Sequence, residues 1–241
     1  MPNEKTADEL KHAHAVREMF SGIAAKYDFL NHFLSVNTDK RWRRLASQNL
    51  RDVLENEKAL VLDVACGTGD LSLELEKSGK AKVFGTDFCR PMLEIASDKN
   101  EKNAANIPYV EADGMNLSFS DASFDAVTIA FGLRNFSNWQ NGLIELHRIL
   151  KQGGKLVILE FSTPILPGFR QLFQFYFSHV LPRIGGVVSG SRGAYEYLPD
   201  SVSRFPDQKN LAKMMKVVGF SDVEYKNLTG GIAAIHSGTR K

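Results

Sequence analysis

Residues 59–72 are Ala-Leu-Val-Leu-Asp-Val-Ala-Cys-Gly-Thr-Gly-Asp-Leu-Ser, and this stretch decides the fold. The apolar run at 60–64 has the length and the branched side chains of a strand buried on both faces, which is typical of parallel sheets. Gly67 and Gly69 predict a sharp turn after it, because without a Cβ atom they let a ligand approach the main chain. The helix that should follow offers free N–H groups to a negatively charged group. The stretch therefore predicts an α/β fold with a ligand site at this turn.

Two kinds of ligand fit a glycine-rich turn between a strand and a helix, and a turn that only joins the two elements is a third alternative. A dinucleotide site expects a third glycine, but Ser72 stands there, and Asp70 would repel a pyrophosphate. A zwitterionic amino acid fits better, because its ammonium can meet Asp63 or main-chain carbonyls while its carboxylate meets the N–H groups. S-adenosylmethionine is such a ligand, whereas the dinucleotide alternative predicts an NAD-linked oxidoreductase.

The next predicted strand, residues 81–87, ends on Asp87, which lies 20 residues after Gly67. An acid at that place accepts hydrogen bonds from ribose hydroxyls. Together the two segments resemble motif I and the following strand of the class I S-adenosylmethionine-dependent methyltransferases. The resemblance implies a Rossmann-like α/β domain with a seven-stranded, mostly parallel sheet whose last strand is antiparallel. The cofactor-binding residues predicted along the chain are Asp63, Gly67, Thr68, Gly69, Asp87, Asp113, Gly114 and Ala130.

The rest of the chain alternates strands and helices, as a parallel sheet requires. Further strands are expected at 107–112, 124–130 and 155–161, and a final antiparallel hairpin at 222–228 and 232–236. Helices are expected at 8–26, 138–150, 169–181 and 206–218, with a loop at 185–193. Asp113 and Gly114 follow the third strand, where they can accept from the exocyclic amine of an adenine and donate an N–H group to it. The predicted domains are a helical segment over the site, 1–50, and a methyltransferase domain, 51–241, with a substrate-binding insertion at 164–206.

The composition argues against several functional classes. The chain has 241 residues, 43% hydrophobic content and a formal net charge of +2, so it can bury a full core and favours no charged partner. Its Lys and Arg residues are spread along the chain, which argues against a nucleic-acid partner. Cys66 and Cys89 make no metal-ligand spacing, so we expect no metal site and a reducing cytosol. Without a signal peptide or an apolar run near the roughly 20 residues of a spanning helix, we expect a soluble, cytoplasmic protein.

Four further motifs resemble the ubiquinone/menaquinone-biosynthesis C-methyltransferases, from about residue 14 to the C-terminus. They are Tyr27-Asp28-Phe29-Leu30-Asn31 with Ser35 and Trp42, Phe131-Gly132-Leu133-Arg134-Asn135, Arg148-Ile149-Leu150-Lys151-Gln152-Gly153-Gly154, and Leu159-Glu160-Phe161-Ser162. The chain departs from this family at Asp39, where the family often has a histidine. The resemblance implies methyl transfer from S-adenosylmethionine to a ring carbon of a reduced polyprenyl quinol.

The implied chemistry needs an ionised quinol hydroxyl, because ionisation makes the neighbouring ring carbon nucleophilic. A phenol with a pKa near 10 is only about 0.1% ionised at pH 7, so stabilising the phenolate by roughly 2–4 kcal/mol recovers most of that factor. Arg134 is the predicted phenolate stabiliser, and Asn135 and Tyr27 are the other catalytic candidates. A structural ion pair between Arg134 and Glu160 is the alternative for these two side chains.

The resemblance also implies a pocket for the quinol ring and a path for its tail. The candidate substrate-binding residues are His32, Phe175, Tyr195 and Tyr197, and the aromatic helix at 169–181 is expected to take the isoprenoid tail. Because that tail lies in the bilayer, we expect peripheral contact with the inner face of the membrane. A homodimer, a methyltransferase for another small aromatic substrate and an inactive lipid-binding module stay open, as does the choice between a benzoquinol and a naphthoquinol.

Overall fold

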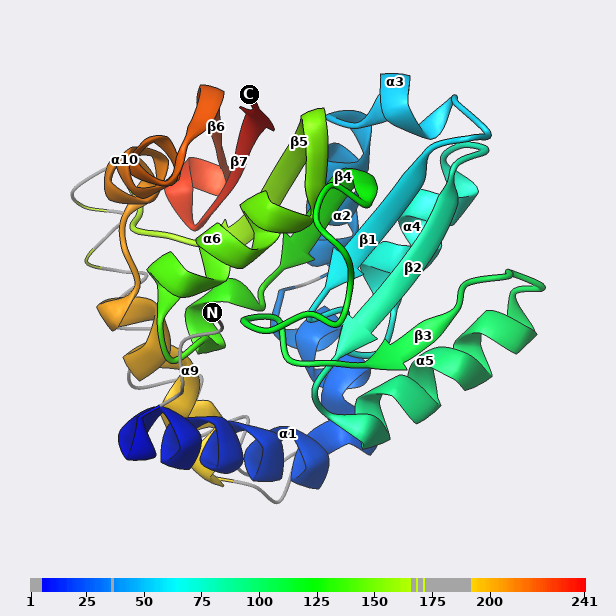
Figure 1. Ribbon diagram of the computed structural model, residues 1–241. Coiled ribbons are helices and arrows are strands. Elements are labelled where there is room, and N and C mark those ends of the chain that lie inside the picture. Colours follow the sequence, from blue (N-terminus) through cyan, green and yellow to red (C-terminus); the bar gives the residue numbers. More distant parts are fainter. Residues whose placement is uncertain (1–5, 36, 166–167, 169–170, 172–191) are drawn as a thin grey trace.

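The computed structural model describes residues 6–35, 37–165, 168, 171 and 192–241 (Figure 1). Its centre is a seven-stranded sheet with the order β3-β2-β1-β4-β5-β7-β6. The strands are β1 Leu60–Val64, β2 Lys82–Asp87, β3 Tyr109–Glu111, β4 Phe124–Ala130, β5 Leu150–Phe161, β6 Phe220–Leu228 and β7 Ala233–Arg240. Strand β7 pairs antiparallel with both β5 and β6, and the other neighbouring strands pair parallel, which confirms the predicted sheet.

Helices cover both faces of the sheet and one of its ends. Helices α2, α3 and α4 pack on one face, and α6 and α10 pack on the other. Helix α1 lies across the carboxyl ends of the central strands and contacts α5 (Figure 1). No helix in the described ranges is both long and apolar enough to cross a bilayer. The helices are α1 Ala7–Leu34, α2 Thr38–Gln48, α3 Arg51–Leu54, α4 Asp70–Lys77, α5 Arg90–Lys102, α6 Trp139–Ile149, α9 Arg192–Arg204 and α10 Gln208–Val218, with the 3-10 helices η1 Leu133–Asn135 and η3 Thr229–Gly231.

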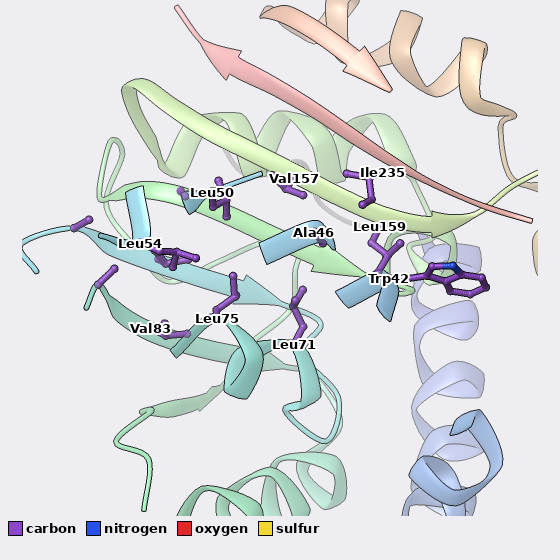
Figure 2. Packing of buried hydrophobic residues seen from close by; sticks show 14 of the residues in the cluster. Trp42, Ala46, Leu50, Leu54, Leu71, Leu75, Val83, Val157, Leu159 and Ile235 are labelled. Carbon is purple, nitrogen blue, oxygen red and sulfur yellow. The ribbon is translucent and has the colours of Figure 1, made fainter. Parts of the chain in front are cut away.

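Alternate residues of each central strand enter two hydrophobic cores, because successive side chains of a strand point to opposite faces. Val61 and Leu159 face α2, α3 and α4, whereas Leu62 and Ile158 face α6 and α10. Burying a side chain of this size contributes about 1.5–3 kcal/mol. Figure 2 shows the first core, in which residues of α2, α3, α4 and the turn between α2 and α3 pack on Val83, Val157, Leu159 and Ile235 of the sheet. The residues from the helices and the turn are Trp42, Ala46, Leu50, Leu54, Leu71 and Leu75. This packing holds the strand ends, and therefore the site, in a fixed arrangement.

Three predicted boundaries were wrong. The helix predicted at 8–26 extends to Leu34, because no proline follows within it and a single glycine costs a helix only about 1 kcal/mol. The loop predicted at 185–193 ends sooner, since α9 begins at Arg192. The fifth strand begins at Leu150, and Gly153 adopts a left-handed φ of 76° inside it. The pairing register between β4 and β5 shifts in the same region, so this glycine belongs to a bulge of the strand and does not end a helix.

The chain leaves β1 and β4 through unusual backbone conformations. Ala65 follows β1 with a φ of 51°, and Phe131 follows β4 with a φ of 56°. For residues with a side chain such conformations cost roughly 1–3 kcal/mol and are concentrated at functional sites. Strands β1 and β4 are neighbours, so the two turns lie side by side at the carboxyl edge. Ligands of open α/β sheets bind at this edge.

Candidate functional site

A cavity lies at the carboxyl edge of the sheet, beneath α1. The turn after β1 and the ends of β2 and β4 form most of its wall. Helix α1 contributes Ala13, Phe20 and Tyr27, which are seven residues apart and therefore share one face of the helix. The other lining residues are Arg43, Asp63, Ala65, Cys66, Gly67, Thr68, Asp70, Leu71, Asp87, Phe88, Met92, Ala112, Asp113, Gly114, Met115, Ala130, Phe131, Gly132, Asn135, Phe136 and Ser137.

Asp87 and Gly67 lie together at the ends of β2 and β1, as the sequence predicted. The Gly67 N–H donates to Asp87 Oδ2 at 2.8 Å, and the Cys89 N–H donates to Oδ1 at 2.8 Å. Each carboxylate oxygen has further lone-pair capacity, so Asp87 can still accept from the two hydroxyls of a ribose. Burial raises the pKa of Asp87 to about 6.

Asp63 is fully buried beneath the same turn and borders the cavity. Ser72 Oγ donates to Asp63 Oδ2 at 2.6 Å, and Thr128 Oγ1 donates to Oδ1 at 2.8 Å. Burial raises the pKa of Asp63 to about 6, and the two hydroxyls oppose that shift. Asp63 thus connects the end of β1 to Ser72 of α4 and to Thr128 of β4, and each of its two carboxylate oxygens already accepts one hydrogen bond.

The predicted adenine-binding pair, Asp113 and Gly114, also lines the cavity. Asp113 Oδ1 accepts from the Met115 N–H at 3.0 Å, which fixes the turn after β3. A Cβ atom on Gly114 would lie 2.4 Å from the ring of Phe136, so only glycine fits beside that ring. Ala130, the last residue of β4, also lines the cavity. The placement suits the predicted roles of these residues, which stay predictions.

Arg134 and Glu160 form the ion pair that the sequence offered as their alternative role. Arg134 Nη1 donates to Glu160 Oε1 at 3.0 Å and also to the Phe131 carbonyl oxygen. Arg134 is 7% exposed, Glu160 is 1% exposed, and Arg134 Nε is buried without a hydrogen-bond partner in the described part of the chain. Burial raises the pKa of Glu160, and the Arg134 charge opposes the shift. Arg134 lies beside the cavity but is not among its lining residues.

Asn135 joins three elements at the β4 end of the cavity. Its carbonyl oxygen lies 3.1 Å from Nε2 of His12 on α1, and its Oδ1 accepts from the Tyr197 hydroxyl of α9 at 3.1 Å. Burial raises the pKa of Tyr197, which keeps that hydroxyl protonated and able to donate. The predicted residues Tyr27 and Asn135 both line the cavity, and Tyr197 reaches it through Asn135.

The other end of α1 is fastened to the turn after β1. Thr68 Oγ1 donates to Asp28 Oδ1, and Lys99 Nζ lies 2.6 Å from Asp28 Oδ2. Gly69 completes this turn with a φ of 81°, and a Cβ atom on it would lie 2.6 Å from the Tyr109 hydroxyl. Together with the contact between His12 and Asn135, these bonds hold α1 over the cavity at both of its ends.

Sequence reasoning missed a charged cluster between α1, α2 and α4. Arg43 Nη1 donates to Asp39 Oδ2, and Arg43 Nη2 lies 3.6 Å from Asp70 Oδ2. His32 lies between the same two carboxylates, with Nδ1 2.8 Å from Asp39 Oδ2 and Nε2 3.7 Å from Asp70 Oδ2. His32 and the two aspartates could chelate a metal ion by their spacing, but the Arg43 guanidinium already supplies the positive charge there. The sequence signals at this place were Asp39, which departs from the family pattern, the candidate residue His32 and the polar and aromatic run at 41–44.

The sequence model of the ubiE/COQ5 methyltransferase family matches residues 6–240. This chain belongs to that family. It is 46% identical over 235 residues to the demethylmenaquinone methyltransferase of Deinococcus radiodurans, covering 97% of this chain and 96% of that protein. It is 47% identical over 229 residues to the ubiquinone/menaquinone biosynthesis C-methyltransferase UbiE of a Geobacter species, covering 93% of this chain and 96% of that protein.

A solved structure supports the fold of this ubiE/COQ5 family member. A SAM-dependent methyltransferase from Thermotoga maritima superimposes with a TM-score of 0.62 at 18% identity, covering 93% of this chain and 99% of that one. At this identity the likeness concerns the fold alone, and it agrees with the mixed, mostly parallel sheet described above.

The remaining predicted residues of this ubiE/COQ5 family member lie either outside the lining of the cavity or outside the described part of the structure. His32 lies in the charged cluster and not among the lining residues of the cavity, so its substrate role stays a prediction. Asp39 occupies the position where the family often has a histidine, and here it holds both His32 and Arg43. Phe175 and the helix predicted at 169–181 lie outside the described residues. Tyr195 belongs to α9, but its side chain lies outside the described part.

Proposed function

We propose that this ubiE/COQ5 family member transfers the methyl group of S-adenosylmethionine to a ring carbon of a reduced polyprenyl quinol, in menaquinone or ubiquinone biosynthesis. The observation that carries the proposal is the family match over residues 6–240, together with curated relatives whose names state this chemistry. When bound, S-adenosylmethionine supplies an electrophilic methyl group. The residues of the chain bind that donor, orient the ring and stabilise the charge that develops on it.

The cavity fits S-adenosylmethionine by charge and by hydrogen bonding. The ligand has two positive groups, a sulfonium and an ammonium, and one negative group, a carboxylate, so its net charge is positive. Four aspartates line the cavity and can balance that charge: Asp63, Asp70, Asp87 and Asp113. Asp87 keeps lone pairs for the ribose hydroxyls at the point where the Gly67 N–H fixes its side chain. Phe88, Met92 and Met115 supply apolar contacts of the kind that an adenine ring needs.

Arg134 stabilises the quinol phenolate in this proposal, and Asn135 and Tyr27 orient the ring. A guanidinium is a poor direct base but a strong donor to a developing oxyanion. The buried Nε of Arg134, which has no partner among the described residues, is a donor left for such a group. Asn135 and Tyr27 both line this cavity, one from the segment that follows β4 and the other from α1.

We also infer that the enzyme works at the cytoplasmic face of the membrane, bound peripherally, because its substrate tail lies in the bilayer. Leu10 on α1 and Ile165 are large apolar side chains that are 56% and 59% exposed, and Ile165 directly precedes the undescribed residues. Exposed apolar groups of this kind can enter the headgroup region. Tail binding by Phe175 and the helix at 169–181, ring binding by Tyr195 and Tyr197, and a homodimer stay predictions.

One experiment tests the reaction and the membrane contact together. Purified protein is given methyl-labelled S-adenosylmethionine and vesicles that carry either a reduced demethylmenaquinol or a reduced benzoquinol. We expect label on the quinol ring in at least one arm, and co-sedimentation of the protein with the quinol-loaded vesicles. No labelled quinol in either arm would refute the proposed reaction, and full activity without any vesicle-bound protein would refute the membrane contact.

Binding of S-adenosylmethionine should strengthen as the pH rises from about 5 to 7.5. The pKa values of Asp63 and Asp87 are about 6 in the folded protein, so both carboxyls are mostly protonated at pH 5. A cationic ligand favours their ionised forms, and each group should therefore add up to about tenfold in affinity across this range. Calorimetry in buffers of different ionisation enthalpy should show proton release near pH 6, and Asp87→Asn should abolish part of it. Proton uptake would contradict the prediction.

A further inference from the structure

One cation faces the acidic cavity. Among the lining residues that the structure describes, Arg43 is the only Lys, Arg or His, while four of the others are aspartates. Arg43 comes from α2 and is 7% exposed, so it is a buried charge and not a mobile surface group. Buried charges persist where they are paired, and Arg43 is paired with Asp39 on its own helix and with Asp70 at the start of α4. Its presence in this wall therefore needs a chemical reason.

Three neighbours hold the guanidinium in one orientation. Nη1 donates to Asp39 Oδ2, Nη2 lies 3.6 Å from Asp70 Oδ2, and the guanidinium carbon lies 5.9 Å from the centre of the Phe131 ring. Asp39 is itself fixed, because Ser35 Oγ donates to its Oδ1 at 2.6 Å. A guanidinium has five N–H donors, and these contacts occupy only part of them. The group is thus pre-oriented with donors to spare.

The carboxylate of S-adenosylmethionine is the one anionic group that must enter this acidic cavity. The sequence suggested the free N–H groups of α4 as its partner. In the structure Asp70 is the first residue of α4, so the helix N-terminus already has an acidic side chain in its first turn. A second carboxylate there would meet Asp70. Lys99 donates to Thr68 and Asp70 at this turn but does not line the cavity. Among the described residues, Arg43 is the positive group that lies beside the turn and also lines the cavity, and it matches a carboxylate in charge and in planar geometry.

We infer that Arg43 binds the amino-acid carboxylate of S-adenosylmethionine, with Asp39 as the positioning residue that aims it. The inference rests on the methyl donor proposed above. It leaves Asp113 to the adenine amine, assigns the other three lining aspartates to the cationic part and the sugar of the ligand, and assigns Arg43 to the anionic part. Burial alone would raise the pKa of Asp39, yet Ser35 and Arg43 hold it below its usual value, so the carboxylate that anchors Arg43 stays ionised.

The test compares two ligands that differ only in this carboxylate. Decarboxylated S-adenosylmethionine keeps the sulfonium and the ammonium, so its affinity relative to S-adenosylmethionine reports the carboxylate contact. By calorimetry, we expect the parent to prefer S-adenosylmethionine by about 10- to 100-fold, as for a hydrogen-bonded charge pair. Arg43→Gln should lose most of that preference while binding the decarboxylated ligand within about threefold of the parent. Arg43→Lys should keep part of the preference.

Arg44 provides the matched control on the same helix. Its side chain is 67% exposed and pairs with Glu74, so Arg44→Gln should leave both affinities unchanged. Equal losses for the two ligands in Arg43→Gln would overturn the inference and make Arg43 structural. A parent that binds neither ligand would instead overturn the proposed methyl donor. If Arg43→Gln does not fold, Arg43→Lys decides: a preference equal to that of the parent, with unchanged affinities, would overturn the inference.

Discussion

Replacing Arg134 with alanine should lower kcat by roughly 100-fold or more and leave the affinity for S-adenosylmethionine almost unchanged. A charged donor in a site that excludes water is worth several kcal/mol at a transition state in which a phenolate develops. The residue is 7% exposed and lies outside the lining of the cofactor cavity, so its loss should not affect donor binding. Steady-state rates with the reduced quinol and calorimetry with S-adenosylmethionine measure the two effects separately.

The ion pair with Glu160 makes a second variant necessary. Removing Arg134 alone leaves the buried Glu160 carboxylate without its partner, which typically costs about 3–5 kcal/mol of folding free energy. The double variant Arg134→Met/Glu160→Leu removes both charges at similar volume and should be closer to the parent in stability. We expect it to remain slow. If the pair serves stability alone, the double variant will turn over at a rate near that of the parent, and Arg134 is then a structural residue.

Gly132→Ala should destabilise the fold by about 1–3 kcal/mol and weaken S-adenosylmethionine binding by roughly tenfold or more. A Cβ atom on Gly132 would lie 2.6 Å from the Cβ atom of Ala65, and neither atom can rotate away. The two turns that follow β4 and β1 would have to separate, and both line the cofactor cavity. Thermal unfolding with and without the ligand measures the two effects, because a ligand that binds only the folded state raises Tm.

Gly22→Ala is the control for that substitution. Gly22 lies in α1, and a Cβ atom added to it would have no heavy atom of another described element within 4 Å. Alanine also favours helices more than glycine does. This variant should be neutral or slightly more stable and should bind the ligand normally. An unchanged Tm shift by the ligand in Gly132→Ala would show that the contact between the two turns does not position the donor.

Local sequence signals predicted most of the parallel sheet. The run at 60–64 and the segment that ends on Asp87 carry enough apolar, branched residues to be recognised as buried strands of a parallel sheet. Because the carboxyl ends of neighbouring parallel strands share one edge, the sequence also placed Gly67 beside Asp87. The start of the fifth strand, predicted at residue 155, was less reliable, because Gly153 permits a bulge that lets the strand begin at Leu150.

The contacts between helices required the tertiary structure. Helical periodicity shows which residues share a face of a helix but not which residues that face contacts. The sequence therefore predicted that the N-terminal helical segment covers the site, whereas the contacts of α1 with Asn135 and Thr68 were found only in the structure. The sequence alone left two roles open for Arg134, that of an ion-pair partner and that of a catalytic donor. Only the structure shows that Arg134 Nη1 lies 3.0 Å from Glu160 Oε1.

The sequence by itself determined the fold class, the family and the strand ends that border the cavity, because these depend on short segments whose patterns are nearly independent of the rest of the chain. The tertiary structure alone decided which charges meet at that cavity. Arg43, Asp70 and His32 come from three helices, and their pairing follows from how those helices pack on the sheet. Electrostatic interactions depend on distance and burial, and neither quantity is encoded in the spacing of residues along a chain.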